Sequence, residues 1–149
     1  MKRDLYDGGI HVPMILHWPE AIKKGRIDDT PWAFADVLPT FADLAEVPLT
    51  SVPRVKTNGV SIRPRLTDTP QELPERTLYW EFGKQAGDPN SGIIGEVFQA
   101  ARRGKWKAVR YGMEAPVELY NLETDPAESN NLAKEHPAIR RENSQIIGN

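Results

Sequence analysis

The sequence contains no cysteine, which excludes disulfide bonds, thiolate metal sites and cysteine nucleophiles within these residues. It also lacks any apolar run close to the ~20 residues that span a bilayer, and its first residues have no signal-peptide hydrophobic region. An excess of one charge is absent too, because 19 basic and 21 acidic residues are well mixed and leave a net charge of −2. A basic surface for nucleic acid is therefore not predicted.

The sequence also lacks histidines and carboxylates at the spacing of a metal site. The three histidines, His11, His17 and His136, do not recur at intervals typical of a metal site, and no carboxylate pair joins them in a motif. What the chain has is 13 prolines and 11 glycines in 149 residues, which predicts a loop-rich body with short elements. The length fits one domain, or a small domain with a piece of another.

A short apolar run near the N-terminus, Val12–Trp18, carries no charge and lies between a glycine pair and a proline. This pattern favours a strand buried on both faces of a sheet, with Gly8-Gly9 turning at positive φ ahead of it. His17 would then be a core histidine. Two interpretations stay open: an edge strand of a small α+β domain, or a strand in the C-terminal fragment of a longer chain. In a fragment, we expect the uncovered strand to form a homo-oligomer or to aggregate.

The next apolar pattern predicts a helix from about Val37 to Glu46. Asp36 precedes this helix as an N-cap, and Pro39 falls in the first turn, where a missing N–H is harmless. A short strand is expected just before it, at Thr30–Phe34. Apolar side chains recur along the helix at helical spacing and are expected to pack in the core; they are Val37, Leu38, Phe41, Leu44 and Ala45.

The second half of the chain has the aromatic content and tight turns of an antiparallel sheet. The predicted strands lie near residues 78–82, 97–103, 106–111 and 117–121. Gly104-Lys105 joins the middle pair as a hairpin, and Trp106 and Leu119 are expected to be buried. A glycine-rich loop, residues 83–95, separates the first two strands. A helix that begins near Asn131 and ends near Gly148 is expected to pack on the sheet.

Several stretches of this chain follow one another in the order of a known family. They are Lys2–Pro13 (Lys-x-x-x-Tyr-Asp-Gly-Gly-Ile-x-Val-Pro), the helix Asp36–Ala45, the hairpin Arg102–Lys107 (Arg-x-Gly-x-Trp-Lys) and Glu118–Ala133 (Glu-Leu-Tyr-Asn-Leu, then Asp-Pro-x-Glu, then Asn-Leu-Ala). In this order they resemble the formylglycine-dependent sulfatases of the alkaline-phosphatase-like superfamily. The resemblance implies a fold class between α/β and α+β. Residues 1–70 would be the end of the sulfatase α/β domain, with a strand, a loop and a helix. Residues 71–149 would form a C-terminal subdomain of four antiparallel strands packed by a helix.

The resemblance implies roles for two residues. In the family, the lysine ahead of the Tyr-Asp/Glu-Gly-Gly turn reaches the sulfate group, which implies a catalytic sulfate contact for Lys2. His11 stands where the family usually has arginine, which implies a weaker substrate contact there. The family's nucleophile motif, Cys/Ser-x-Pro-x-Arg, matures to formylglycine and is absent from this sequence. The family's Ca²⁺ ligands would also lie outside the chain, so neither a metal site nor a nucleophile is assigned within it.

Two functions stay open. The first is the C-terminal region of a sulfatase, a sulfuric ester hydrolase acting on a sulfated small molecule or glycan; the family is commonly periplasmic, extracellular or lysosomal. The second is a non-catalytic α+β module for binding or assembly that retains only the sulfatase fold. We expect no activity from the chain alone, because sulfuryl transfer without nucleophile and metal loses most of its rate enhancement.

Overall fold

A computed structural model describes residues 4–51, 56–67, 69–83 and 97–148. The chain divides into two compact units, one made of residues 1–13 with 75–149 and the other of residues 14–74. The first thirteen residues thus belong with the C-terminal part of the chain. The proposed end of an α/β domain at residue 70 stays a prediction. No helix in the described part of the chain is long and apolar enough to cross a membrane.

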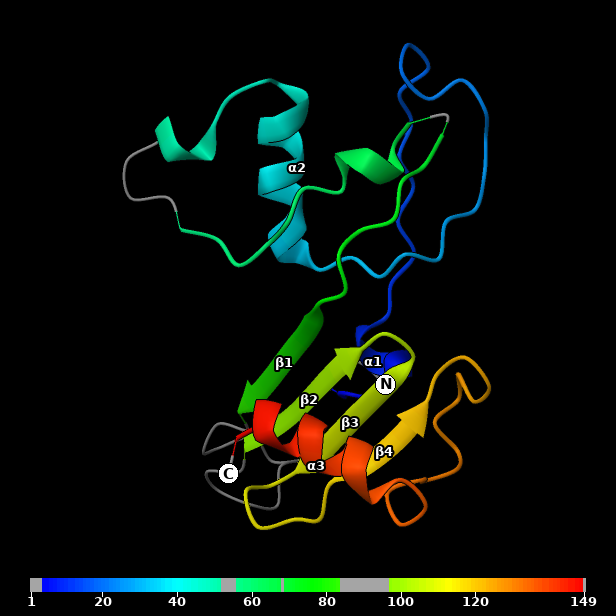
Figure 1. Cartoon of the computed structure of the whole chain (residues 1–149), viewed down its shortest axis with the longest axis vertical. Helices are drawn as coiled ribbons and strands as arrows, with labels where there is room; N and C mark the ends of the chain where they lie inside the picture. Colours follow the sequence, from blue (N-terminus) through cyan, green and yellow to red (C-terminus); the bar gives the residue numbers. More distant parts are fainter. Residues whose placement is uncertain (1–3, 52–55, 68, 84–96, 149) are drawn as a thin grey trace, which may run out of the picture. The chain divides into compact units, whose positions relative to one another are not determined.

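The sheet unit contains the four predicted strands. They are β1 (Thr77–Gly83), β2 (Val97–Arg103), β3 (Trp106–Tyr111) and β4 (Glu118–Asn121). Each pairs antiparallel with the next in the order β1-β2-β3-β4, and Figure 1 shows them side by side. The predicted antiparallel sheet is confirmed. Gly104-Lys105 joins β2 and β3 as a tight hairpin, and the aromatic residues of the strands favour pairing.

Both faces of the sheet are covered. Successive side chains of a strand point to opposite faces, so β3 has two different environments. Val109 packs with Leu5 and Tyr120 in a cluster that also contains Tyr6 and Ile10. Leu5, Tyr6 and Ile10 belong to residues 4–11, the N-terminal loop. Ala108 and Leu119 pack on the opposite side with residues of the C-terminal segment. The N-terminal loop thus covers a face of the sheet that the sequence left unassigned.

The C-terminal helix α3 (Pro137–Ile146) packs against β2 and β3 as predicted, but it begins six residues later than expected. The side chain of Asn131 explains the late start. Its Oδ1 accepts hydrogen bonds from the backbone N–H groups of Leu119 (3.1 Å) and Ala133 (3.0 Å). These bonds hold the segment around Asn131 beside β4. The helix therefore begins only at Pro137, a favourable first-turn residue. Leu119 is fully buried as expected, whereas Trp106 is only half-buried.

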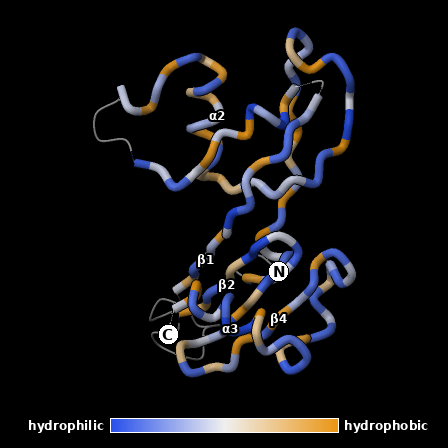
Figure 2. Tube along the Cα trace, in the orientation of Figure 1, coloured by the Kyte–Doolittle hydropathy of each residue, from blue (hydrophilic) through white to orange (hydrophobic). Residues whose placement is uncertain are grey.

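The unit of residues 14–74 is built around α2 (Val37–Leu44), with 3₁₀ turns at η1 (Phe34–Asp36), η2 (Leu49–Ser51) and η3 (Arg63–Arg65). The helix is confirmed, but the prediction that its apolar stripe is core is wrong. Its buried side chains are Pro39 and Thr40, preceded by buried Asp36. Leu38 and Phe41 are largely exposed, and hydrophobic residues, orange in Figure 2, recur along this part of the chain.

Hydrogen bonds explain why polar side chains occupy the inner face of α2. The buried Asp36 carboxylate accepts from the backbone N–H groups of Ala33 (2.7 Å) and Val60 (3.0 Å). The Thr40 hydroxyl donates to the Asp36 carbonyl (2.6 Å) and accepts from the N–H of Ile62 (3.1 Å). The helix is therefore anchored to the returning chain by paired polar groups, whose hydrogen bonds offset the cost of their burial.

The predicted N-terminal strand is wrong. Residues 12–18 form no strand and are mostly exposed, with Ile15 93% exposed. A strand needs a hydrogen-bonded neighbour, and among the described residues only β1 to β4 pair in a sheet. His17 is consequently exposed rather than a core histidine, and Thr30–Phe34 also lacks a strand. Self-association through this exposed apolar segment stays a prediction.

Candidate functional site

The loop that carries the glycine pair lies on the sheet as one short helical turn, α1 (Asp7–Ile10), beside β2 and β3 in Figure 1. Leu5, just before it, is buried in the sheet core. The ring of Tyr6 packs against those of Tyr111 and Tyr120, with centroids 5.5 and 6.0 Å apart. We call residues 4–11 the N-terminal loop; it is the described segment next to Lys2 in the sequence.

Tyrosine hydroxyls and carboxylates hold the N-terminal loop on the strands. The Tyr6 hydroxyl donates to Glu118 Oε2 (2.5 Å), which also accepts from Tyr120 (2.9 Å). The Tyr111 hydroxyl donates to Asp4 Oδ1 and accepts from the backbone N–H of Leu5. Burial, followed by the hydrogen bond to Glu118, raises the pKa of Tyr6 well above its usual range and that of Tyr120 to about 12. These phenols stay neutral donors at physiological pH.

A second set of contacts is ionic. Lys107 on β3 has a fully buried side chain, and its Nζ lies 2.6 Å from Asp7 Oδ1 and 2.8 Å from Glu128 Oε1. The backbone N–H of Asp7 also donates to Glu128 Oε2 (2.5 Å). Arg102 adds a more distant cation, 4.0 Å from Asp7 Oδ2. We call Asp7, Lys107 and Glu128 the ion cluster.

The two glycines of the N-terminal loop have different roles. Neither is among the residues with positive φ, so the prediction of a left-handed glycine turn is wrong. Gly9 is instead required for close approach, because a Cβ there would overlap the backbone oxygen of Asp4. A Cβ on Gly8 would meet nothing within 4 Å.

The two residues singled out from the sequence differ in what the structure says of them. Lys2 lies outside the described residues. His11 follows α1 with an exposed side chain, and its Nδ1 lies 3.7 Å from Asp7 Oδ2. Its substrate contact stays a prediction. The sequence reasoning missed Lys107 and Glu128, although the hairpin and Asp-Pro-x-Glu motifs that contain them were recognised; a lysine within an apolar strand was the available signal.

The described residues do not fit the metal or the nucleophile that the family implies. None of them form a group of three or more His, Asp or Glu side chains able to hold an ion. The carboxylates nearest the N-terminal loop already accept from protein donors: Asp7 from Lys107, Glu128 from the backbone N–H of Asp7, and Glu118 from two tyrosines. Ca²⁺ needs six to eight oxygen ligands, so a calcium site would need oxygens from elsewhere.

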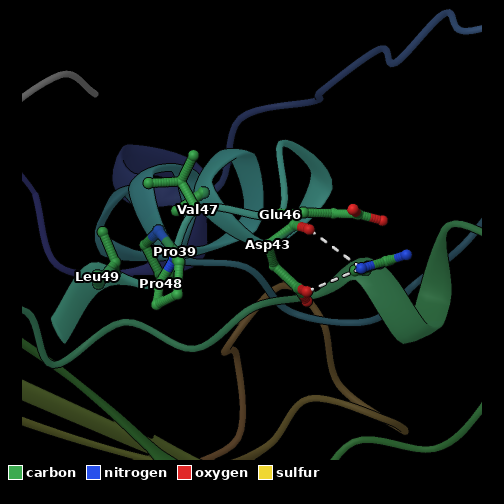
Figure 3. A pocket seen from close by; sticks show the side chains of 8 residues that line it. Pro39, Asp43, Glu46, Val47, Pro48 and Leu49 are labelled. Atoms are coloured by element: carbon green, nitrogen blue, oxygen red, sulfur yellow. Dashed lines mark hydrogen bonds and ion pairs between the residues drawn. The ribbon is translucent and has the colours of Figure 1, made fainter. Parts of the chain in front are cut away.

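The unit of residues 14–74 has a separate open hollow of about 560 Å³ at the C-terminal end of α2. Figure 3 shows Pro39, Val47, Pro48 and Leu49 lining it, with charged side chains at the margin. Asp43, at that margin, accepts from Ser61 (2.6 Å) and pairs with Arg63 (3.0 Å). The hydrogen bond from Ser61, followed by that from Arg63, lowers the pKa of Asp43. These partners give Asp43 and Ser61 a structural role.

Residues 1–145 match the family described as N-sulphoglucosamine sulphohydrolase, C-terminal. The chain belongs to this sulfatase C-terminal family. This sulfatase C-terminal region is 34% identical over 133 residues to the choline-sulfatase of Rhizobium meliloti, covering 89% of the chain and 23% of the relative. It is 27% identical over 149 residues to arylsulfatase K of Danio rerio, covering 98% of the chain and 27% of that protein. The chain thus spans about a quarter of the length of these relatives.

Solved structures agree with the sequence relatives. A structure from Bacteroides thetaiotaomicron, described as that of a sulfatase, superposes with a TM-score of 0.57 at 28% identity, over 72% of this chain and 22% of the other. A 2-O GAG sulfatase superposes with a TM-score of 0.53 at 28% identity over the same shares. The predicted fold class, the C-terminal part of an alkaline-phosphatase-like sulfatase, is therefore confirmed.

Proposed function

We propose that this sulfatase C-terminal region completes the active site of a sulfuric ester hydrolase by supplying the sulfate contact Lys2. The observation that carries the proposal is the family match over residues 1–145, which includes the segment with Lys2. The formylglycine nucleophile and the Ca²⁺ site would come from residues outside this chain. The chain would therefore supply binding and positioning.

The chemical role of Lys2 follows from charge. A sulfate ester is anionic, and negative charge builds on its sulfuryl and leaving oxygens as the ester bond breaks. An ammonium placed at those oxygens stabilises the transition state more than the ground state. His11 would add a second contact to the anion, and only in its protonated form would it carry charge.

Exposed apolar residues support the proposal that residues 1–70 end a larger α/β domain. Within the unit of residues 14–74, Ile15, Ile27 and Phe34 are at least 90% exposed, and Phe41 is 62% exposed. Large apolar side chains exposed to this degree favour a covering partner. The proposed cover is the rest of a sulfatase α/β domain.

The proposed substrate class is a sulfate ester of a small molecule or a glycan. Relatives of this chain are described as a choline-sulfatase, an N-acetylgalactosamine-6-O-sulfatase and a steryl-sulfatase. These substrates share the sulfate group and little else. The shared contact, Lys2, would therefore recognise the sulfate, and the choice among alcohols would depend on other residues.

The test joins this chain to a sulfatase α/β part that carries the Cys/Ser-x-Pro-x-Arg motif and measures turnover of 4-nitrophenyl sulfate. We expect turnover from the joined protein, none from the chain alone, and loss of activity on Ca²⁺ removal. Lys2→Ala should lower kcat/KM by about 10²–10³-fold, the usual effect of removing one donor that stabilises transition-state charge. The matched control is Lys134→Ala, at an exposed lysine of the same unit.

Full turnover by the Lys2→Ala variant would contradict the role of Lys2. A folded joined protein that contains formylglycine by mass spectrometry, yet has no turnover, would instead favour a non-catalytic binding or assembly module. The formylglycine measurement separates this outcome from a simple failure of maturation.

A further inference from the structure

We propose that Lys107 is a positioning residue: its buried ammonium fixes the N-terminal loop on the sheet through Asp7 and Glu128. The effect of this ion cluster on sulfate binding rests on the proposed function of Lys2, which lies just ahead of the loop in the sequence. The attachment itself rests only on contacts within the described chain. This attachment gives Asp7, Lys107 and Glu128 a function that the proposed function of the chain does not include.

Burial and charge show that the ion cluster is more than a surface pair. The side chain of Lys107 is fully buried, and that of Glu128 is 2% exposed. A charge removed from water to this degree is strongly unfavourable unless an opposite charge and hydrogen bonds replace its hydration. Lys107 meets two carboxylate oxygens within 2.8 Å, and each carboxylate comes from a different segment. Removing the ammonium would leave two carboxylates close together, with Arg102, 4.0 Å from Asp7 Oδ2, as the nearest described arginine.

The backbone is fixed together with the side chains. Glu128 Oε2 accepts the N–H of Asp7, the first residue of α1. Glu128 itself has a φ of +54°, a left-handed conformation that is uncommon for residues other than glycine. The surrounding contacts hold Glu128 in that conformation, with its carboxylate beneath the N-terminal loop. Strained backbone of this kind persists only where neighbouring contacts determine it.

The ion cluster also brings together three of the four sequence stretches that carry the sulfatase resemblance. Asp7 belongs to Tyr-Asp-Gly-Gly, Lys107 to the Arg-x-Gly-x-Trp-Lys hairpin and Glu128 to Asp-Pro-x-Glu. These residues are 100 and 21 positions apart along the chain but share one set of ion pairs. The motifs therefore describe one attachment point of the N-terminal loop.

Loss of Lys107 should release the N-terminal loop and leave the sheet paired. The register of β3 with β2 and β4 depends on backbone hydrogen bonds, and α3 covers the face opposite Lys107. The expected signature is local opening. A side chain that merely added to the core would instead lower the stability of all segments together.

The experiment is amide hydrogen exchange on the 149-residue chain and its Lys107→Met variant. The reporting amides are those of Gly9 and His11, which donate to Tyr6 and Asp7 carbonyl oxygens, both at 2.8 Å. We expect their exchange to become faster by about tenfold or more, while the amides of β3 change by less than about threefold. The matched control is Lys105→Met, on the same hairpin, where the lysine pairs with Glu123 at an exposed site. It should change neither group.

Two further variants test the same attachment of the N-terminal loop. If Lys107→Met does not fold, Glu128→Gln is measured in its place, because it weakens the same contacts while keeping the side-chain shape. Asp7→Asn combined with Lys107→Met removes one of the stranded carboxylates and should recover part of the lost protection. Unchanged exchange at Gly9 and His11 in a folded variant, or equal loss across the sheet, would overturn the proposal.

The link to sulfate is tested separately in the joined sulfatase. Lys107→Met should lower kcat/KM for 4-nitrophenyl sulfate by about tenfold or more, and Lys105→Met should not. Local opening without any loss of kcat/KM, in a protein where Lys2→Ala is inactive, would overturn the positioning role and leave the proposed function standing. Full activity of Lys2→Ala would overturn the proposed function and leave the attachment standing.

Discussion

At the scale of single residues, the glycine pair of the N-terminal loop gives a matched experiment. Gly9→Ala should lower the free energy of unfolding by about 1–3 kcal/mol, because the new Cβ would overlap the backbone of Asp4. Gly8→Ala has open space and no positive φ, so it should be neutral or stabilise by up to about 1 kcal/mol through the unfolded state. Urea denaturation measures both. Equal effects of the two substitutions would show that the loop does not approach Asp4 as described.

Single residues also show where sequence reasoning fails. The pair Gly8-Gly9 was expected to turn at positive φ, whereas it is helical and one glycine serves a close contact. Lys107 was not predicted as a structural residue, because the sequence of a strand does not show what will cover each of its faces. Positive φ occurs instead at Glu46 and Glu128 among the described non-glycine residues, and no composition rule points to glutamate there.

At the scale of elements, the end of α2 has a backbone conformation that suits glycine better than the glutamate found there. The N–H of Val47 donates to the carbonyl of Ala42 (2.9 Å) and that of Glu46 to Asp43 (3.2 Å). This is the Schellman pattern, which places the residue after the C-cap in a left-handed conformation that glycine prefers. Glu46 occupies that position with a φ of +56°.

Glu46→Gly should therefore stabilise the chain by about 0.5–1 kcal/mol, since relief of the left-handed strain exceeds the entropy that glycine loses on folding. The control is Glu46→Ala, which removes the same charge but keeps a Cβ and should give no gain. Thermal or urea unfolding of the two variants decides the matter. A gain with alanine equal to that with glycine would assign the effect to charge rather than to backbone conformation.

The elements differ in how well the sequence predicts them. The four strands and the hairpin at Gly104-Lys105 were predicted, because neighbouring segments pair locally through turns that the sequence encodes. The run 12–18 was predicted as a strand and is not one. Apolar composition shows that a segment can be buried, but it cannot show that a neighbouring strand is available. The same reasoning placed the apolar stripe of α2 in the core, whereas its inner face is polar and hydrogen-bonded.

At the scale of the whole molecule, the tyrosines make the free energy of unfolding depend on pH in the alkaline range. Burial and carboxylate acceptors raise the pKa of Tyr6, Tyr111 and Tyr120 in the folded chain, whereas unfolded tyrosine has a pKa of about 10. The unfolded state therefore loses protons first as the pH rises. The contribution of these groups is complete below about pH 10 and declines as the pH rises toward the folded pKa values.

The measurement is urea denaturation at about pH 8, 10 and 11.5, together with phenolate absorbance. We expect the free energy of unfolding to fall between the second and third conditions and phenolate to form together with unfolding. The chain in concentrated urea serves as the reference, where tyrosines should titrate near pH 10. Phenolate formation by these three tyrosines near pH 10 in the folded chain would show that their hydroxyls do not hydrogen-bond to the carboxylates.

The sheet unit is discontinuous along the chain, and this has a consequence for synthesis on the ribosome. The N–H of Asp7 bonds the side chain of Glu128, 121 residues later. At about 5–20 residues per second, the N-terminal loop leaves the ribosome roughly 6–24 s before its last partner is made. For more than half of that interval the loop has no sheet to bind, because residues 14–74 are completed before the first described strand, β1, begins at Thr77. Within these 149 residues, the segment proposed to bind sulfate is therefore translated early and is among the last to reach its native contacts.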